Sequence, residues 1–95
     1  MAIWRIETCK AHSGYRSTAS IYNNIRNGLW TKAVSIGVRS VGWPSDEVEA
    51  INSYRIAGAS DEQIRELVKL LHEKRTELIN QNSSLVLISR GNHGA

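Results

Sequence analysis

A chain of 95 residues makes one small domain with a modest core, which leaves little room for a deep substrate cleft and disfavours catalysis. Its single cysteine excludes an internal disulfide and a zinc site of several thiolates. The net charge of +3 is unevenly divided: residues 1–44 hold six Lys or Arg against one Glu, and residues 45–95 hold six against eight acidic residues, which indicates a basic front half that meets a polyanion.

The chain begins with a short apolar stretch followed by a short helix. Residues 3–6 (IWRI) are compatible with a strand or with the lead into the first helix, and both interpretations stay open. From Ile6 to about His12 the sequence is compatible with a helix, which Ser13-Gly14 ends. Cys9 is predicted to pack as a small hydrophobic side chain.

A second helix is predicted between Ser17 and Gly28. The Ser17 hydroxyl can accept a hydrogen bond from a free backbone N–H at the helix start, and Gly28 can adopt the left-handed conformation that ends a helix. At about 100° per residue, one side of this helix is largely apolar. That side carries Thr18, Ile21, Ile25 and Leu29, with Tyr22 at its edge.

The opposite side of the second helix is polar and has no acidic residue. It carries Ser20, Asn23 and Asn27, with Asn24 and Arg26 on its flanks and Arg16 before the cap. Asparagine weakens a helix because its amide competes for backbone hydrogen bonds, so three of them need a compensating role. Asparagine can pair with N6 and N7 of adenine, while serine and arginine can bind phosphates or guanine. This side is therefore either a base-reading face or a solvated polar surface.

A β-hairpin is predicted directly after the second helix. A short helix, a glycine turn and a second helix form a helix-turn-helix by spacing, although small helical hairpins share that pattern. The hydrophobic period then changes from 3.6 to 2, which predicts strands at 33–36 and 41–43 around a turn at 37–40. Lys32 lies at the base and Arg39 at the tip, so the hairpin is either a wing that reaches phosphates or a minor groove, or a structural hairpin.

Core packing is the predicted role of Trp43, because its large ring lies on the inward phase of the second strand. Pro44 ends that strand, and Ser45 is predicted to cap a third helix whose first turn holds Asp46 and Glu47. The third helix should stop near Gly58. Its apolar stripe is Val48, Ile51 and Tyr54.

The longest helix is predicted to begin at a capping box formed by Ser60 and Gln63. Its first half should complete the core, and Leu71, Leu78 and Ile79 are candidates for a dimer contact, although Lys74 and Arg75 interrupt the stripe. Its apolar positions are Ile64, Leu67, Val68, Leu71, Leu78 and Ile79, with Leu70 on a second, smaller edge.

After the longest helix the sequence has a short polar segment, an apolar run and a glycine-containing end. Residues 80–84 are polar and are predicted to form a loop. Residues 85–88 (LVLI) fit a terminal strand, a dimer contact or an apolar tail, and residues 91–95 are predicted to be disordered.

In the order and spacing of several short motifs, the chain resembles the AlpA family of phage-type regulators, whose fold is related to the MerR-like winged helix. The resemblance covers residues 5 to about 57. Two features depart from the common pattern: Trp30-Thr31 replaces a Phe-Pro, and the turn between Gly14 and Tyr22 is one residue longer. The motifs are Ser13-Gly14, Ser20-Ile21-Tyr22, Gly28-Leu29-Trp30 before Lys32, Ile36-Gly37, Arg39-Ser40-Val41-Gly42-Trp43 and Glu47-Val48.

The resemblance implies a regulator made by a prophage or another integrated element. Members of the family either activate transcription of an integrase gene or act as excisionases, which bend DNA and set the direction of recombination. Ser20 and Tyr22 match positions of the family's recognition helix, and Arg39 matches a position of its wing.

The leading hypothesis is therefore a sequence-specific regulator that binds double-stranded DNA. We expect a mostly α-helical winged helix-turn-helix with a small β-hairpin and a C-terminal amphipathic helix. The predicted units are residues 1–58 for DNA binding, 59–82 for a helix that packs on them or dimerises, and 83–95 for a flexible tail. The predicted DNA-binding residues are Arg16, Ser17, Thr18, Ser20, Tyr22, Asn23, Asn24, Arg26, Asn27, Lys32, Arg39 and Ser40.

Two other classes of function compete with this hypothesis. The alternative is a protein-interaction adaptor that bridges an integrase or another partner through the C-terminal helix, and homodimers or cooperative multimers on DNA fit either reading. An enzyme is disfavoured, because His12, His72 and His93 are scattered and no nucleophile motif is present. Without a signal peptide or a run of roughly 20 apolar residues, we expect a cytoplasmic protein with no membrane partner, no cofactor and no metal.

Overall fold

The computed structural model describes the backbone of residues 2–94 and the side chains of residues 2–80. In this part of the chain the fold is mostly helical with a small three-stranded antiparallel sheet of order β1-β3-β2. The elements are β1 (Ile3–Trp4), α1 (Ile6–Ser13), α2 (Thr18–Arg26), β2 (Val34–Gly37), β3 (Ser40–Pro44), α3 (Ser45–Ile56) and α4 (Asp61–Gly94).

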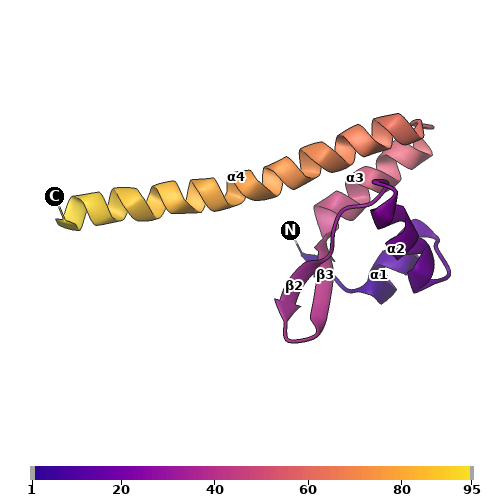
Figure 1. The fold of residues 1–95 in the computed structure, drawn as a ribbon, viewed down its shortest axis with the longest axis horizontal. Coiled ribbons are helices and arrows are strands. Elements are labelled where there is room, and N and C mark those ends of the chain that lie inside the picture. Colours follow the sequence, from indigo (N-terminus) through magenta and orange to yellow (C-terminus); the bar gives the residue numbers. More distant parts are fainter. Residues whose placement is uncertain (1, 95) are drawn as a thin grey trace.

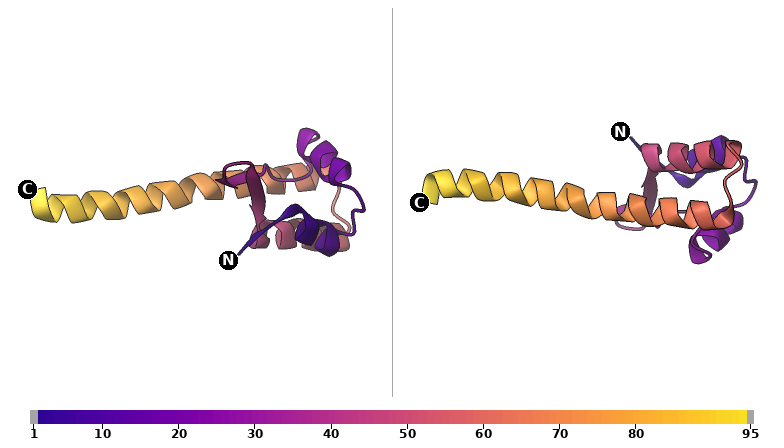
Figure 2. Two further views of the ribbon diagram at one scale, coloured as in Figure 1. Left: turned by 90° about the horizontal axis from the view of Figure 1, so that it is seen from below. Right: turned by 90° about the horizontal axis from the view of Figure 1, so that it is seen from above.

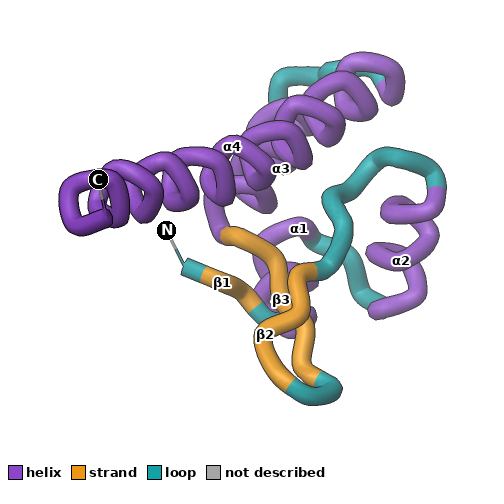
Figure 3. The backbone as a smooth tube through the Cα atoms, turned by 60° about the vertical axis from the view of Figure 1, so that its left-hand side comes forward, coloured by secondary structure: helices purple, strands orange, loops and turns teal. Residues whose placement is uncertain are grey.

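The long helix α4 gives the molecule its elongated shape, with extents of 54 × 30 × 21 Å. All other elements gather around the first half of α4, and its second half projects away from them (Figure 1). Seen from above, α3 lies on one side of α4 and α2 on the other (Figure 2). The sheet lies at the opposite end of α3 from the α3–α4 connection (Figure 3).

The ends of α1 and α2 lie where the local signals predict them. Gly14 follows α1 with a φ of 80°, and Gly28 follows α2 with a φ of 77°. Ser17 caps α2, because its hydroxyl accepts a hydrogen bond from the Ser20 amide at 3.2 Å. The Gly28 amide donates to the Ile25 carbonyl and the Leu29 amide to the Asn24 carbonyl, which is the Schellman arrangement.

The sheet resolves the open interpretation of the first residues in favour of a strand. In β1, Ile3 pairs with Pro44 and Trp4 with Trp43 of β3. A Cβ on Gly42 would lie 2.5 Å from Cγ2 of Ile3 and 3.0 Å from the Trp4 carbonyl oxygen, so only glycine lets β1 pass this closely. The predicted hairpin is confirmed as the antiparallel pair β2–β3, with Ser35 opposite Val41.

The hydrophobic core joins α2, β3, α3 and the first half of α4. Trp43 is fully buried, as predicted, and its indole N–H donates to the Thr31 carbonyl at 2.9 Å. Burial raises the pKa of the Cys9 thiol to about 11, so Cys9 stays protonated and packs as a small apolar group. The buried apolar residues are Cys9, Ile21, Trp30, Trp43, Val48, Ile51, Ile64, Leu67, Val68 and Leu71.

The predicted cap at Ser45 is wrong. Pro44 occupies the N-cap position of α3, and Ser45 is the first residue of the helix. The Ser45 hydroxyl accepts from the Ala2 amide at 3.0 Å, and the Ser45 amide donates to the Ala2 carbonyl at 2.7 Å. These two hydrogen bonds continue the pairing of β1 with β3 by one residue on each strand, from Ala2 to Ser45.

The start of α4 matches the predicted capping box. The Gln63 amide donates to the Ser60 hydroxyl at 3.2 Å, and the Ser60 amide donates to the Gln63 side-chain oxygen at 2.8 Å. Leu71 lies in the core with 8% exposure, so its predicted role in a dimer contact is wrong, whereas Leu78 and Ile79 are exposed.

The loop at 80–84 and the strand at 85–88 are also wrong, because α4 continues to Gly94. Asparagine and serine lower helix propensity by only a few tenths of a kcal/mol each, and a helix that has already nucleated gains a hydrogen bond with every residue added. The division into residues 59–82 and a flexible tail at 83–95 stays a prediction. Within the described residues, no helix combines the length and apolar content needed to cross a lipid bilayer.

Candidate nucleic-acid interface

The outer face of α2 presents the predicted base-reading residues to solvent. Ile21 is fully buried beneath this helix and holds its apolar side against the core. Thr18, predicted on the apolar side, is exposed, because the packed side of α2 begins only at Ile21. Arg16, Ser17, Thr18, Tyr22, Asn23, Arg26 and Asn27 are exposed, and Ser20 and Asn24 are half-buried.

Hydrogen bonds divide the asparagines of α2 into two kinds. The Asn24 amide donates to the Ser20 carbonyl at 3.0 Å, so this side chain is tied to its own helix. Asn23 is exposed, and its side-chain oxygen accepts from the Arg26 guanidinium one turn later. Asn23 and Arg26 therefore form an oriented polar pair on the surface, in which the Asn23 NH₂ group keeps its donors for a ligand.

The tip of the hairpin exposes Arg39 beside Val38, which is 92% exposed. Arg39 has a φ of 61°, so it occupies the left-handed position of the turn between β2 and β3. The neighbouring Ser40 is half-buried at the start of β3. The hairpin and α2 lie on the same side of α4 (Figure 1).

An aromatic contact connects α2 to the sheet. The ring of Tyr22 meets the ring of Trp43 edge to face, with centroids 6.1 Å apart. Tyr22 is 40% exposed, so it both packs on the core and borders the outer face of α2. The position of the hairpin relative to α2 therefore depends on the buried indole of Trp43.

Two hydrogen bonds fix the base of the hairpin to α4. The Lys32 amide donates to Nε2 of His72 at 3.1 Å, and the Lys32 carbonyl accepts from Arg75 at 2.8 Å. Burial lowers the pKa of His72, and the positive charge of Arg75 lowers this pKa further, while Glu47 opposes the shift. His72 is therefore a neutral acceptor near pH 7, and the exposed side chain of Lys32 remains free of these backbone contacts.

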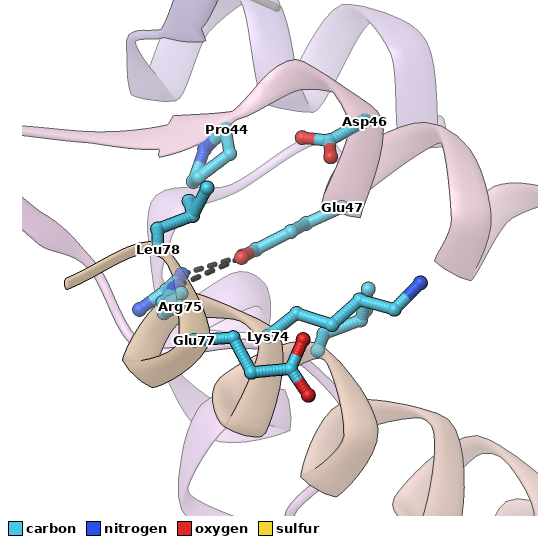
Figure 4. Close-up of a pocket in the computed structure, with 8 residues that line it drawn as sticks. Pro44, Asp46, Glu47, Lys74, Arg75, Glu77 and Leu78 are labelled. Atoms are coloured by element: carbon cyan, nitrogen blue, oxygen red, sulfur yellow. Dashed lines mark hydrogen bonds and ion pairs between the residues drawn. The ribbon is translucent and has the colours of Figure 1, made fainter. Parts of the chain in front are cut away.

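A buried ion pair connects α3 to α4 and was missed by the sequence analysis. Glu47 is 4% exposed, and its carboxylate accepts from Nε and Nη2 of Arg75, with 2.7 Å between Nε and Oε2. Figure 4 shows the two side chains pointing toward each other beneath Pro44 and Leu78. The only sequence signal was that Arg75 interrupts the apolar stripe of α4.

The arrangement of two short helices, a glycine turn and a following hairpin is consistent with the helix-turn-helix class of compact domains. The family described as "Prophage CP4-57 regulatory protein (AlpA)" matches residues 12–53. Over these residues the chain is similar to AlpA-type prophage regulatory proteins, which confirms the resemblance in its motifs. The match ends within α3 and leaves α4 outside. No curated protein and no solved structure gives a significant match.

Proposed function

We propose that the protein is a sequence-specific regulator that binds double-stranded DNA through a winged helix-turn-helix of the MerR and excisionase type. The observation that carries this proposal is the exposed outer face of α2, which displays asparagine, serine and arginine without a carboxylate. Its regulatory family and its basic front half agree with this role. We propose binding and not catalysis as its activity.

In this mechanism α2 enters the major groove, whose width of about 12 Å admits a helix. Asn23, Asn27 and Ser20 face the base edges. Arg26 and Lys32 bind phosphates beside α2, and Arg39 contacts the backbone or the minor groove as the tip of the wing. Phosphate contacts set the orientation of the helix, and the asparagines supply the discrimination between sequences.

The biological role that follows is control of an integrated element. Bound at an integrase promoter the protein would activate transcription, and bound near an attachment site it would act as an excisionase. Both roles require the same domain, so the position of the binding sites distinguishes them. Footprinting on the integrase promoter and on the ends of the element provides that test.

Asn23→Ala is expected to weaken binding to a duplex selected from a randomised library by about 1 to 3 kcal/mol, with little effect on a scrambled duplex. The loss follows from removing the amide that reads a base edge, while alanine keeps the helix intact. Fluorescence anisotropy titrations with both duplexes measure the difference.

Asn24→Ala is the matched control. Asn24 is among the predicted DNA-binding residues, but its amide is bound to the Ser20 carbonyl within the same helix, so we assign it no base contact. This substitution should change the two affinities by similar, small amounts. Equal losses on the selected and scrambled duplexes for Asn23→Ala would refute the base-reading role of Asn23.

A protein-interaction role through α4 is a second candidate. It is favoured by Leu78 and Ile79, which are 47% and 66% exposed on the helix beyond its contact with the core. A chain truncated after Arg75 keeps the ion pair with Glu47 and removes these residues. If the adaptor role is correct, pull-down with the integrase of the same element should be lost while DNA binding is retained. Retention of both would rule out the adaptor role.

A further inference from the structure

A groove of about 260 Å³ lies between the end of α2, the base of the hairpin and α4. Four cationic side chains from three segments line it, together with the neutral His72, and no carboxylate does. The cations are Arg26 from α2, Lys32 from the segment before β2, and Arg65 and Lys69 from α4. Three of these cations, all except Arg65, form no ion pair with the side chains described through residue 80, so their charges repel one another and an anion in this groove would be stabilised.

Arg65 positions α4 against α2 and is already engaged. Its Nε donates to the Asn27 carbonyl at 2.9 Å, and its Nη1 forms an ion pair with Glu62. The Arg65 side chain also packs on Gly28, where an added Cβ would lie 3.4 Å from its Cγ. The start of α4 is therefore attached to the end of α2, and the backbone that carries Lys69 is held beside the backbone that carries Arg26.

The other three cations are available to a ligand. Lys32 and Lys69 are both exposed, and neither forms an ion pair with the side chains described through residue 80. Arg26 uses a guanidinium N–H on Asn23 and keeps further donors. Because Arg26 belongs to the outer face of α2, an anion bound here would lie next to whatever that face contacts.

We propose that α4 is part of the DNA interface, with Lys69 joining Arg26 and Lys32 and binding a further backbone phosphate of the duplex that α2 reads. This inference rests on the proposed function. Phosphate oxygens are the anions that a duplex presents beside an inserted helix, and lysine and arginine are their usual partners. Lys69 lies outside residues 12–53, so the contact belongs to this chain's own long helix and not to the segment shared with the family.

The test compares Lys69→Gln with Lys74→Gln. Lys74 is also exposed on α4 but borders the separate pocket around Glu47 and Glu77, which makes it a matched loss of one charge. Affinities for the selected and the scrambled duplex are measured by anisotropy over a series of salt concentrations, and thermal melting checks that both variants stay folded.

Lys69→Gln should lower the affinity for both duplexes about fivefold at about 0.15 M salt and reduce the slope of log K against log salt by about 0.9. Lys74→Gln should leave that slope unchanged. The inference would be overturned if Lys69→Gln kept the salt slope of the wild-type protein, or if the two variants lost the same amount of affinity. Neither result would contradict DNA binding itself. A wild-type protein that binds neither duplex would instead overturn the proposed function, and this inference with it.

Discussion

Replacing Glu47 by alanine is expected to destabilise the protein by about 3 kcal/mol, because it leaves the Arg75 guanidinium partly buried without its carboxylate. The Glu47 side chain is 5% exposed and that of Arg75 is 23% exposed, so the pair is largely shielded from water. Arg75 also donates to the Lys32 carbonyl, so a loosened Arg75 would release the base of the hairpin from α4. The loss is thus expected to affect both the stability of the fold and the position of the wing.

Urea denaturation of Glu47→Ala measures this loss, with Glu49→Ala as the control. Glu49 is exposed on the same helix, and its replacement should change the free energy of unfolding by less than about 0.5 kcal/mol. In the double variant Glu47→Ala/Arg75→Ala, part of the lost stability should return, because no unpaired charge remains. Equal stabilities of Glu47→Ala and Glu49→Ala would contradict a structural role for the ion pair.

The affinity for the selected duplex is expected to fall about a hundredfold between roughly 50 and 200 mM salt. This value corresponds to about four neutralised phosphates per subunit, and a further contact from Lys69 would steepen the fall by about another three- to fourfold. The fall results from the release of condensed counterions when lysine and arginine bind phosphates. Three of these contacts are assigned to Arg26, Lys32 and Arg39, and Arg16, the fourth cation of the predicted interface, lies before α2 on the side predicted to face the major groove.

The variant Arg39→Ala measures how much the hairpin tip contributes to the salt dependence of DNA binding. It should weaken binding to every sequence and lower the salt slope by about 0.9, because the tip would lose its phosphate contact. Arg5→Ala is the control, since Arg5 is exposed but lies outside the predicted interface. An unchanged slope in Arg39→Ala would remove the hairpin tip from the phosphate contacts, and an affinity that is independent of salt would contradict backbone binding altogether.

Features that depend on a few neighbouring residues could be predicted from the sequence. Ser17 and Gly28 set the ends of α2, and Ser60 with Gln63 starts α4, because these side chains and backbone groups bond within one helical turn. Trp43 was identified as core from its phase in the strand. Such signals act locally and need no knowledge of the tertiary contacts.

Features that depend on residues distant in the sequence could not be predicted. In the sequence, Glu47 cannot be distinguished from any other acidic residue in the first turn of a helix. Only the tertiary approach of α4 places it beside Arg75. Ser45 resembles a cap, but the pairing of β1 with β3 gives its hydroxyl to Ala2. The end of α4 was missed because its polar residues resemble a loop, although they continue a helix.

The candidate site likewise has features that could be predicted from neighbouring residues and features that depend on tertiary contacts. Helical periodicity was sufficient to place Asn23, Asn24 and Arg26 on or beside one polar face. It could not show that Asn24 is tied to the Ser20 carbonyl while Asn23 is exposed and oriented by Arg26. Lys69 resembled a solvated residue of a long helix, and only the packing of α4 on the core, together with the contact of Arg65 with Asn27, brings it to the end of α2.

Hydroxyl-radical footprinting on the ends of the integrated element and on its integrase promoter tests most directly whether α2 and the hairpin contact one duplex. Wild-type protein should protect a discrete stretch of backbone, and Arg39→Ala should lose protection at one flank of that stretch while its centre stays protected. Uniform weak protection along the DNA, or a footprint that Arg39→Ala leaves unchanged, would contradict a shared interface of helix and hairpin.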